Sequence, residues 1–191
     1  KAYGSTGFID IREEGLEDGL HESLYRMMHI GLLCNDVKSI NGNTENSREN
    51  LVEQALIKFC QQNGMYKKDL DKRYRRIFQI LFDSERRIMT TVNKMDDKYR
   101  ANVKGAADSI ISRCTHIMKN GVEVEITEED IKAIKDADIS MANDCLYVVG
   151  FAYRNFNYEP SLKENIESNL VFVGLIGFDN ILKENAVNSI K

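Results

Sequence analysis

Two nearly unbroken apolar runs, residues 146–153 and 170–176, constrain the fold of this chain more than any other feature. Both are rich in β-branched and aromatic residues, and runs of this length are typical of strands buried on both faces of a sheet. The rest of the chain alternates irregularly between helical and strand patterns. That order favours the α+β class with a largely antiparallel sheet.

Apolar residues recur at helical spacing in four segments, at residues 16–33, 49–62, 106–118 and 128–143. Ser47 is placed to cap the second of these helices and Gly64 to end it. Its buried stripe is predicted to contain Leu51, Ala55, Leu56 and Phe59. Residues 127–130, Thr-Glu-Glu-Asp, resemble a capping box and start the fourth helix. That helix is predicted to pack Ile131, Ile134, Ile139 and Met141.

Shorter strands are predicted at residues 76–82, 87–94, 99–104 and 122–126. Asp96 and Asp97 supply the turn between the second and third of these strands. Residues 65–75 are strongly charged and show no clear period, so we expect a solvated connection there.

Composition limits the class of protein. With 191 residues, 42% of them hydrophobic and 29% charged, the chain is long enough to bury the core of one domain. The net charge of -4 argues against a nucleic-acid partner. No apolar run approaches the ~18 residues that span a bilayer. The four cysteines are scattered, and no histidine lies at zinc-finger spacing from them, so we expect reduced thiols and assign neither His21 nor His29 a ligand role.

Residues 82–89 are the stretch most suggestive of a binding site. They combine the ring of Phe82 with Arg86 and Arg87, and residues 100–104 have enough β character to pair with them. Such a pairing would bring a ring and several cations onto one surface, which suits a planar heterocycle that carries phosphates. The alternative is a core phenylalanine beside a solvated arginine pair, and composition alone favours it.

Catalytic motifs are not visible in the sequence. It contains no G-x-x-x-x-G-K-[ST] loop, no G-x-G-x-x-G, no G-x-S-x-G and no H-E-x-x-H. No two acidic residues are singled out as a general acid and a general base. The sequence therefore disfavours an independent soluble enzyme.

Six short motifs follow one another along the chain. They are Glu53-Gln54-Ala55-Leu56, Phe82-x-Ser84-x-Arg86-Arg87-x-Met89, Lys104-Gly105-Ala106, Arg113-Cys114, Gly150-Phe151-Ala152-Tyr153-Arg154 and Phe172-Val173-Gly174-Leu175-Ile176-Gly177. Over residues 16–185 this succession resembles the nucleotide-binding domain of P-type cation-transporting ATPases, most closely their calcium-transporting branch. The resemblance implies a twisted, largely antiparallel sheet flanked by helices.

The resemblance also implies a nucleotide site made of Phe82, Lys104, Glu53, Arg87, Gly105, Ser84 and Met89. In this site Phe82 would stack on adenine, and Glu53 would accept a hydrogen bond from the exocyclic amine. Lys104 would line the base of the pocket, and Arg87 would approach the phosphates. Gly105 would let the backbone come close to the ligand.

The implied function is to bind ATP, with Mg²⁺ on the nucleotide, and to present the γ-phosphate to an aspartate outside this chain. The family's D-K-T-G-T, T-G-D and G-D-G-x-N-D segments are absent, so the chain alone is not expected to be catalytic. Its partners would be the phosphorylation and actuator domains of a longer pump, on the cytoplasmic side of a membrane that this piece does not enter. Residues 1–177 would form the domain, and residues 178–191 would begin the hinge.

Departures from the family pattern keep a second interpretation open. Tyr147 stands where the family has an arginine, and residues 49–52 replace the usual start of the helix motif. The family's D-P-P-R hinge reads Asn-Ile-Leu-Lys at residues 180–183. The alternative is a degenerate domain that keeps the fold and serves as a regulatory or interaction module.

Overall fold

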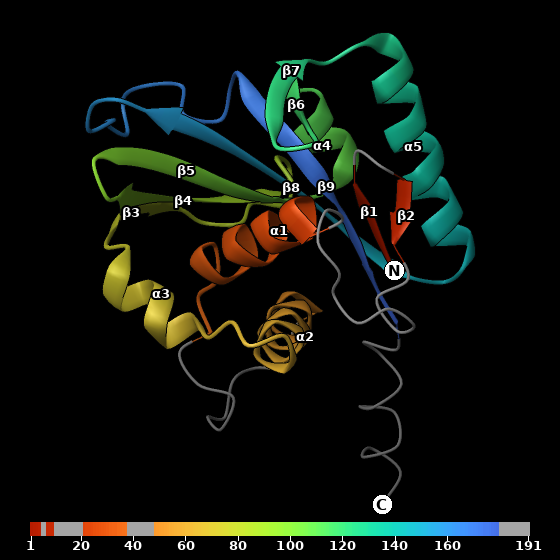
Figure 1. The fold of residues 1–191 in the computed structure, drawn as a ribbon, viewed down its shortest axis with the longest axis horizontal. Coiled ribbons are helices and arrows are strands. Elements are labelled where there is room, and N and C mark those ends of the chain that lie inside the picture. Colours follow the sequence, from red (N-terminus) through yellow and green to blue (C-terminus); the bar gives the residue numbers. More distant parts are fainter. Residues whose placement is uncertain (5–6, 10–20, 38–47, 180–191) are drawn as a thin grey trace, which may run out of the picture.

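The computed structural model describes residues 1–4, 7–9, 21–37 and 48–179. Within these ranges, nine strands form one open sheet, and five helices accompany it (Figure 1). The strands are β1 (Ala2–Gly4), β2 (Gly7–Ile9), β3 (Arg76–Ile80), β4 (Ile88–Met95), β5 (Lys98–Gly105), β6 (Cys114–Lys119), β7 (Val122–Glu125), β8 (Tyr147–Phe156) and β9 (Leu170–Phe178). The helices are α1 (His21–Leu33), α2 (Arg48–Gln62), α3 (Lys67–Arg73), α4 (Ala107–Ile111) and α5 (Glu128–Asn143). The predicted α+β class is confirmed.

The two apolar runs form neighbouring strands at the centre of the sheet. The main path of the sheet is β2-β1-β9-β8-β5-β4-β3, and β6 pairs with both β7 and β9. Neighbouring strands are antiparallel except for the pair β6 and β9. Every residue of β9 up to Gly177 is buried, as expected for a strand covered on both faces.

Two apolar layers cover opposite faces of these central strands. Phe151 and Tyr153 of β8 belong to the core cluster that also holds residues of α1 and α2. Ala152, between them, belongs to the cluster formed with α4 and α5. Successive side chains of a strand point to opposite faces, so one short segment of β8 contributes to both layers.

The beginning of β1 and the end of β9 lie side by side. The strands are antiparallel, with Ala2 opposite Ile176. The N–H of Gly177 donates to the carbonyl of Lys1 at 2.9 Å, and the terminal amine of Lys1 donates back to Gly177 at 3.3 Å. The chain therefore enters and leaves this sheet at one place.

Residues 65–75 are not simply a connection, because seven of them form α3. None of these residues is buried, so the apolar period that would predict a helix is missing. Charge explains the helix instead. Asp69 lies in the first turn and Lys72 in the last, as the helix dipole favours, and Lys67 Nζ lies 2.9 Å from Asp71 one turn further on.

The predicted helix over residues 106–118 is wrong beyond its first turns. It ends at Ile111, and β6 follows, paired with β7 and β9. Ile110 and Ile117 are both buried in the same core cluster, although one lies on a helix and the other on a strand. Their spacing therefore imitated a helical stripe that the chain does not form.

The capping box of α5 is confirmed. The N–H of Asp130 donates to Thr127 Oγ1 at 3.2 Å, and the N–H of Thr127 donates to Asp130 Oδ2 at 3.1 Å. One predicted packing residue is wrong, because Ile139 is 58% exposed. The fully buried residues of the helix are Ile134, Ala137 and Met141.

The buried face of α2 is rotated relative to the prediction. Its buried hydrophobic residues are Val52, Leu56, Ile57 and Cys60. Of the predicted stripe only Leu56 is fully buried, since Leu51, Ala55 and Phe59 are only partly covered. The rotation brings Glu53 inward, to 8% exposure. Ser47, the predicted cap, lies outside the described residues.

Candidate functional site

A buried ion pair between a strand and a helix lies at the centre of the candidate site. Lys104, near the end of β5, places its Nζ 2.7 Å from Oε1 of Glu53 in α2. The two side chains are only 9% and 10% exposed. Met89, the β4 partner of Lys104 in the strand register, is also buried. The structure therefore brings three of the predicted site residues together.

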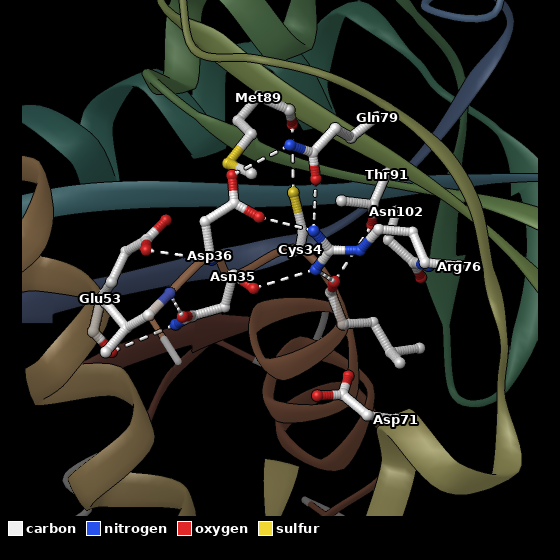
Figure 2. Close-up of polar contacts among 12 residues, drawn as sticks. Cys34, Asn35, Asp36, Glu53, Asp71, Arg76, Gln79, Met89, Thr91 and Asn102 are labelled. Carbon is white, nitrogen blue, oxygen red and sulfur yellow. Dashed lines mark hydrogen bonds and ion pairs between the residues drawn. The ribbon is translucent and has the colours of Figure 1, made fainter. Parts of the chain in front are cut away.

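The loop after α1 holds the Glu53 carboxylate from the other side. The N–H of Asp36 donates to Glu53 Oε2 at 3.1 Å, and Asn35 Nδ2 donates to the Glu53 carbonyl at 3.2 Å (Figure 2). One carboxylate oxygen thus pairs with Lys104, and the other accepts from the loop. Hydrogen bonds to a charged group are stronger than neutral ones, so Glu53 is held in one orientation.

Arg76, at the start of β3, fixes that loop (Figure 2). Its Nη2 donates to the carbonyls of Leu33 and Asn35 at 2.8 and 2.9 Å, and its Nη1 lies 2.5 Å from Asp36 Oδ1. Gln79 accepts from Arg76 and donates to Asp36. Sequence reasoning missed these residues, because the bonds from Arg76 to the loop join positions at least 40 apart in the chain. The one available signal was a polar Asn-Asp pair directly after an apolar helix.

The thiol nearest the ion pair is inert. Cys34 is fully buried and donates to the carbonyl of Met89 at 3.3 Å. Burial raises the pKa of the Cys34 thiol to about 11, so it stays protonated near neutral pH. All cysteines are free, as predicted, although Cys145 is exposed.

The predicted strand over residues 76–82 is too long, because β3 ends at Ile80, so Phe82 lies on the loop between β3 and β4. The ring is 44% exposed. Neighbouring Leu81 is 60% exposed, so the loop presents two apolar side chains to solvent. The core alternative for Phe82 is therefore wrong, and the ring is available for stacking.

A hydrogen-bonded turn follows Phe82. Asp83 Oδ1 accepts from the N–H groups of Glu85 and Arg86, both at 2.9 Å. The N–H of Arg87 donates to the Asp83 carbonyl at 2.6 Å. The bond from the Arg86 N–H is the main reason why the pKa of the Asp83 carboxyl lies below its usual value. Ser84 lies exposed at the tip of this turn.

Arg86 ties the turn to the body of the domain. Its Nη1 lies 2.6 and 2.7 Å from the two oxygens of Glu167, in the connection between β8 and β9. Thr90 Oγ1 donates to the same carboxylate at 2.7 Å. Arg86 Nη2 donates to the Leu81 carbonyl at 2.7 Å, directly before Phe82. The position of the Phe82 loop thus depends on this network.

Arg87 and Gly105 lie against each other at the end of β4 and β5. A Cβ atom on Gly105 would lie 2.3 Å from the Arg87 carbonyl, so only glycine fits there. The Arg87 carbonyl accepts from the N–H of Ala106 at 3.0 Å. The guanidinium of Arg87 pairs with Asp108 at 2.8 Å, and both side chains are more than half exposed. The close approach observed at Gly105 is therefore to the protein's own backbone.

The predicted residues form two groups at the same end of β4 and β5. Glu53, Lys104 and Met89 are buried between the sheet and α2, whereas Phe82, Ser84 and Arg87 are exposed on the adjoining loop. Gly105 joins the groups, because it follows Lys104 and contacts Arg87. An exposed ring beside cations can stack on a heterocycle while the cations pair with phosphates.

Comparison with known proteins assigns the chain to a class. The family model described as P-type ATPase, cytoplasmic domain N, matches residues 23–185. The chain therefore belongs to that family.

Relatives with named activities extend the comparison. Calcium-transporting ATPase 1 of Bacillus cereus is 37% identical over 146 residues, which cover 76% of this chain and 16% of the relative. A calcium-transporting ATPase of Listeria monocytogenes is 29% identical over 167 residues, or 87% of this chain and 19% of the relative. Sodium/potassium exporting P-type ATPase 1 of Saccharomyces cerevisiae is 30% identical over 168 residues, which cover 81% of this chain and 14% of the relative. The chain spans less than a fifth of the length of each of these proteins.

Proposed function

We propose that this chain is the ATP-binding domain of a membrane cation pump and that the transported ion is calcium. The family assignment and the two calcium-transporting relatives support this proposal. The observation that carries the binding function is the arrangement of Phe82, Arg87 and Lys104 at one end of β4 and β5, where the ring of Phe82 is exposed and Lys104 is buried.

Lys104 and Phe82 hold the base of the nucleotide. The exposed face of Phe82 stacks on adenine, an interaction worth ~1–3 kcal/mol. Lys104 has three N–H donors and gives one to Glu53, so two remain for a ligand. Glu53 orients Lys104, and its remaining lone pairs accept the exocyclic amine of the base. Met89 forms part of the pocket wall beneath them.

Arg87 and Ser84 lie where the phosphates would extend into solvent. Arg87 is paired with Asp108, but the side chains are 53% and 61% exposed. Exposed pairs of this kind contribute only about 0–1 kcal/mol, so Arg87 can exchange Asp108 for a phosphate at little cost. In the described residues, no group of three His, Cys, Asp or Glu side chains could hold a metal ion. Mg²⁺ would therefore be bound through the phosphates, where it neutralises their charge.

The chemical step belongs to other parts of a longer protein. The domain would present the γ-phosphate to an aspartate of a phosphorylation domain, on the cytoplasmic side of the membrane, and an actuator domain would complete the pump. Among the described residues, no helix is long and apolar enough to cross a membrane. Residues 178–191 are proposed as the start of the hinge, and residues 180–191 of this segment lie outside the described part.

A titration of the isotope-labelled chain with millimolar Mg·ATP tests the proposal. Saturable changes in the NMR signals of Phe82, Arg87 and Lys104 are expected. Unchanged signals at all three residues would overturn the binding function. The result would then favour the regulatory or interaction module, which Tyr147 in place of the family's arginine supports.

A further inference from the structure

A cavity lined by several cationic side chains lies on the α1 side of the sheet, toward the end of β5 remote from Lys104. The cavity has a volume of about 550 Å³. Its lining includes Arg26 and His29 of α1, Lys98 and Arg100 of β5, Tyr74 and Asn155. These residues belong to no motif that the proposed ATP site uses.

Arg100 is a partly buried cation that forms no ion pair with a carboxylate of the described residues. Its Nε donates to Asn155 Oδ1 at 3.0 Å, and its guanidinium carbon lies 5.0 Å from the centroid of the Tyr153 ring. Within the described ranges, its terminal nitrogens have neither a hydrogen bond nor an ion pair. Burial, and then the nearby Arg26, lower the pKa of Arg100. Among the described residues, the buried atoms without a partner do not include these terminal nitrogens, so they are open to an acceptor that enters the cavity.

His29 supplies an independent observation in the same cavity. The side chain is 7% exposed, and its Nδ1 is one of two buried side-chain polar atoms without a partner in the described part of the chain. The ring lies between those of Tyr25 and Tyr74, at centroid distances of 6.0 and 5.2 Å. Buried polar atoms in folded proteins are nearly always hydrogen-bonded, so an orphan in a pocket wall indicates a missing partner.

The carboxylates around the cavity are already engaged. Glu22 pairs with Arg26 at 3.3 Å, Asp96 lies 3.5 Å from Arg73, and Glu123 accepts from the Tyr153 hydroxyl at 2.6 Å. These contacts balance the charges of Glu22 and Asp96, whereas the hydroxyl of Tyr153 leaves Glu123 charged, and that charge acts on Arg100. Lys98 has no ion pair within the described residues. One net positive charge therefore remains from Lys98, Arg100 and Glu123, which favours an anion, and the planar fork of arginine matches the oxygens of a phosphate group.

We propose that this pocket binds a small phosphate-bearing anion. The terminal nitrogens of Arg100 donate to the phosphate oxygens, Lys98 adds the second charge, and Asn155 and the ring of His29 supply further hydrogen bonds. The site is separate from the proposed adenine site, so either can exist without the other.

Titration of the labelled 191-residue chain with inorganic phosphate, at constant ionic strength in chloride, tests this site. Saturable shifts are expected at the Arg100 Nε–H, the His29 ring and the Asn155 side-chain amide, with the Phe82 loop unchanged. Arg100→Gln should weaken binding about tenfold or more, because a charge-assisted bidentate contact is lost. Arg75→Gln removes the same charge from an exposed position outside the cavity and should leave binding unaltered.

Three results would overturn the proposal. They are shifts that do not saturate, equal weakening by both substitutions, and shifts confined to Phe82 and Arg87. The last result would mean that phosphate enters only the proposed nucleotide site. If Arg100→Gln does not fold, Lys98→Gln replaces it, because Lys98 is exposed and its substitution disturbs no packing.

Discussion

Glu167 accepts two hydrogen bonds from Nη1 of Arg86, at 2.6 and 2.7 Å, across 81 positions of the sequence. Through this contact the connection between β8 and β9 holds the loop that carries Phe82. The Glu167 side chain is 12% exposed and also accepts from Thr90 Oγ1, so its contact with Arg86 is a partly buried network and not an isolated surface ion pair.

Glu167→Gln should weaken ATP binding about fivefold, because a loss of ~1 kcal/mol in a partly buried charged contact loosens the loop before Phe82. Isothermal titration calorimetry with Mg·ATP measures the change. Glu164→Gln, in the same connection but paired with Tyr158 at the surface, is the matched control. Unchanged affinity in Glu167→Gln would show that the network serves stability alone.

Phe82→Ala should lower ATP affinity about tenfold or more, since stacking on one aromatic ring is worth ~1–3 kcal/mol. The ring is 44% exposed, so the free energy of unfolding should change little. Leu81→Ala removes an adjacent, more exposed apolar side chain and is the control in the same calorimetric titration. Equal losses in both variants would argue against a stacking role for Phe82.

Lys104→Met should destabilise the domain by about 3–5 kcal/mol, because it leaves the buried Glu53 carboxylate without its charged partner. Urea denaturation measures the free energy of unfolding. The double variant Lys104→Met with Glu53→Leu should recover part of the loss, since no charge is then buried alone. Asp71→Asn breaks the pair with Lys67, in which the carboxylate is 47% exposed, and should cost about 1 kcal/mol or less. A similar small effect of Lys104→Met would contradict the importance of the buried pair.

Stability should fall on acidification because of His29. Burial, and then the charges of Arg100, Arg26 and Arg73, lower the pKa of His29 to about 4 from its usual 6.5. Between these two values the unfolded chain binds a proton that the folded chain does not. Stability is therefore complete above pH 6.5 and decreases by up to about 3 kcal/mol as the pH approaches 4.

Urea denaturation at pH 7 and pH 4.5, in a buffer without phosphate, checks this dependence on pH. His29→Gln should flatten it, whereas His116→Gln, on the exposed face of β6, should leave it intact. An unaltered slope in His29→Gln would assign the acid sensitivity to other groups.

Local signals in the sequence were sufficient for several elements. The composition of the two apolar runs was enough to predict the buried strands β8 and β9. Thr127 and Asp130 were enough to predict the start of α5, because the capping hydrogen bonds join these two nearby residues. The segment from residue 106 to residue 118 could not be read in this way. Only its pairing with β9, more than fifty residues further on, makes its second half a strand.

The residues of the candidate site also divide into those that a local motif predicted and those that it did not. Phe82, Lys104 and Glu53 were named because they belong to short motifs, and the contact of Lys104 with Glu53 confirms that two of them meet. Arg76 and Glu167 carry no motif. Their roles arise from partners at least forty positions away, and such contacts exist only in the folded chain.

The adjacency of Lys1 and Gly177 has a mechanical consequence. If the domain is connected to the other domains of a pump through both strands, as proposed above, both connections lie at one edge of the sheet, and the domain could rotate about that edge with little internal distortion. Neighbouring strands lie about 4.8 Å apart, and β4 is three strands away from β9. Phe82 and Arg87, at the far side of the sheet, therefore sit on a lever arm of about 15 Å. A modest rotation about this edge would move a ligand bound at Phe82 and Arg87 by several ångströms, while the sheet itself moves as a rigid body.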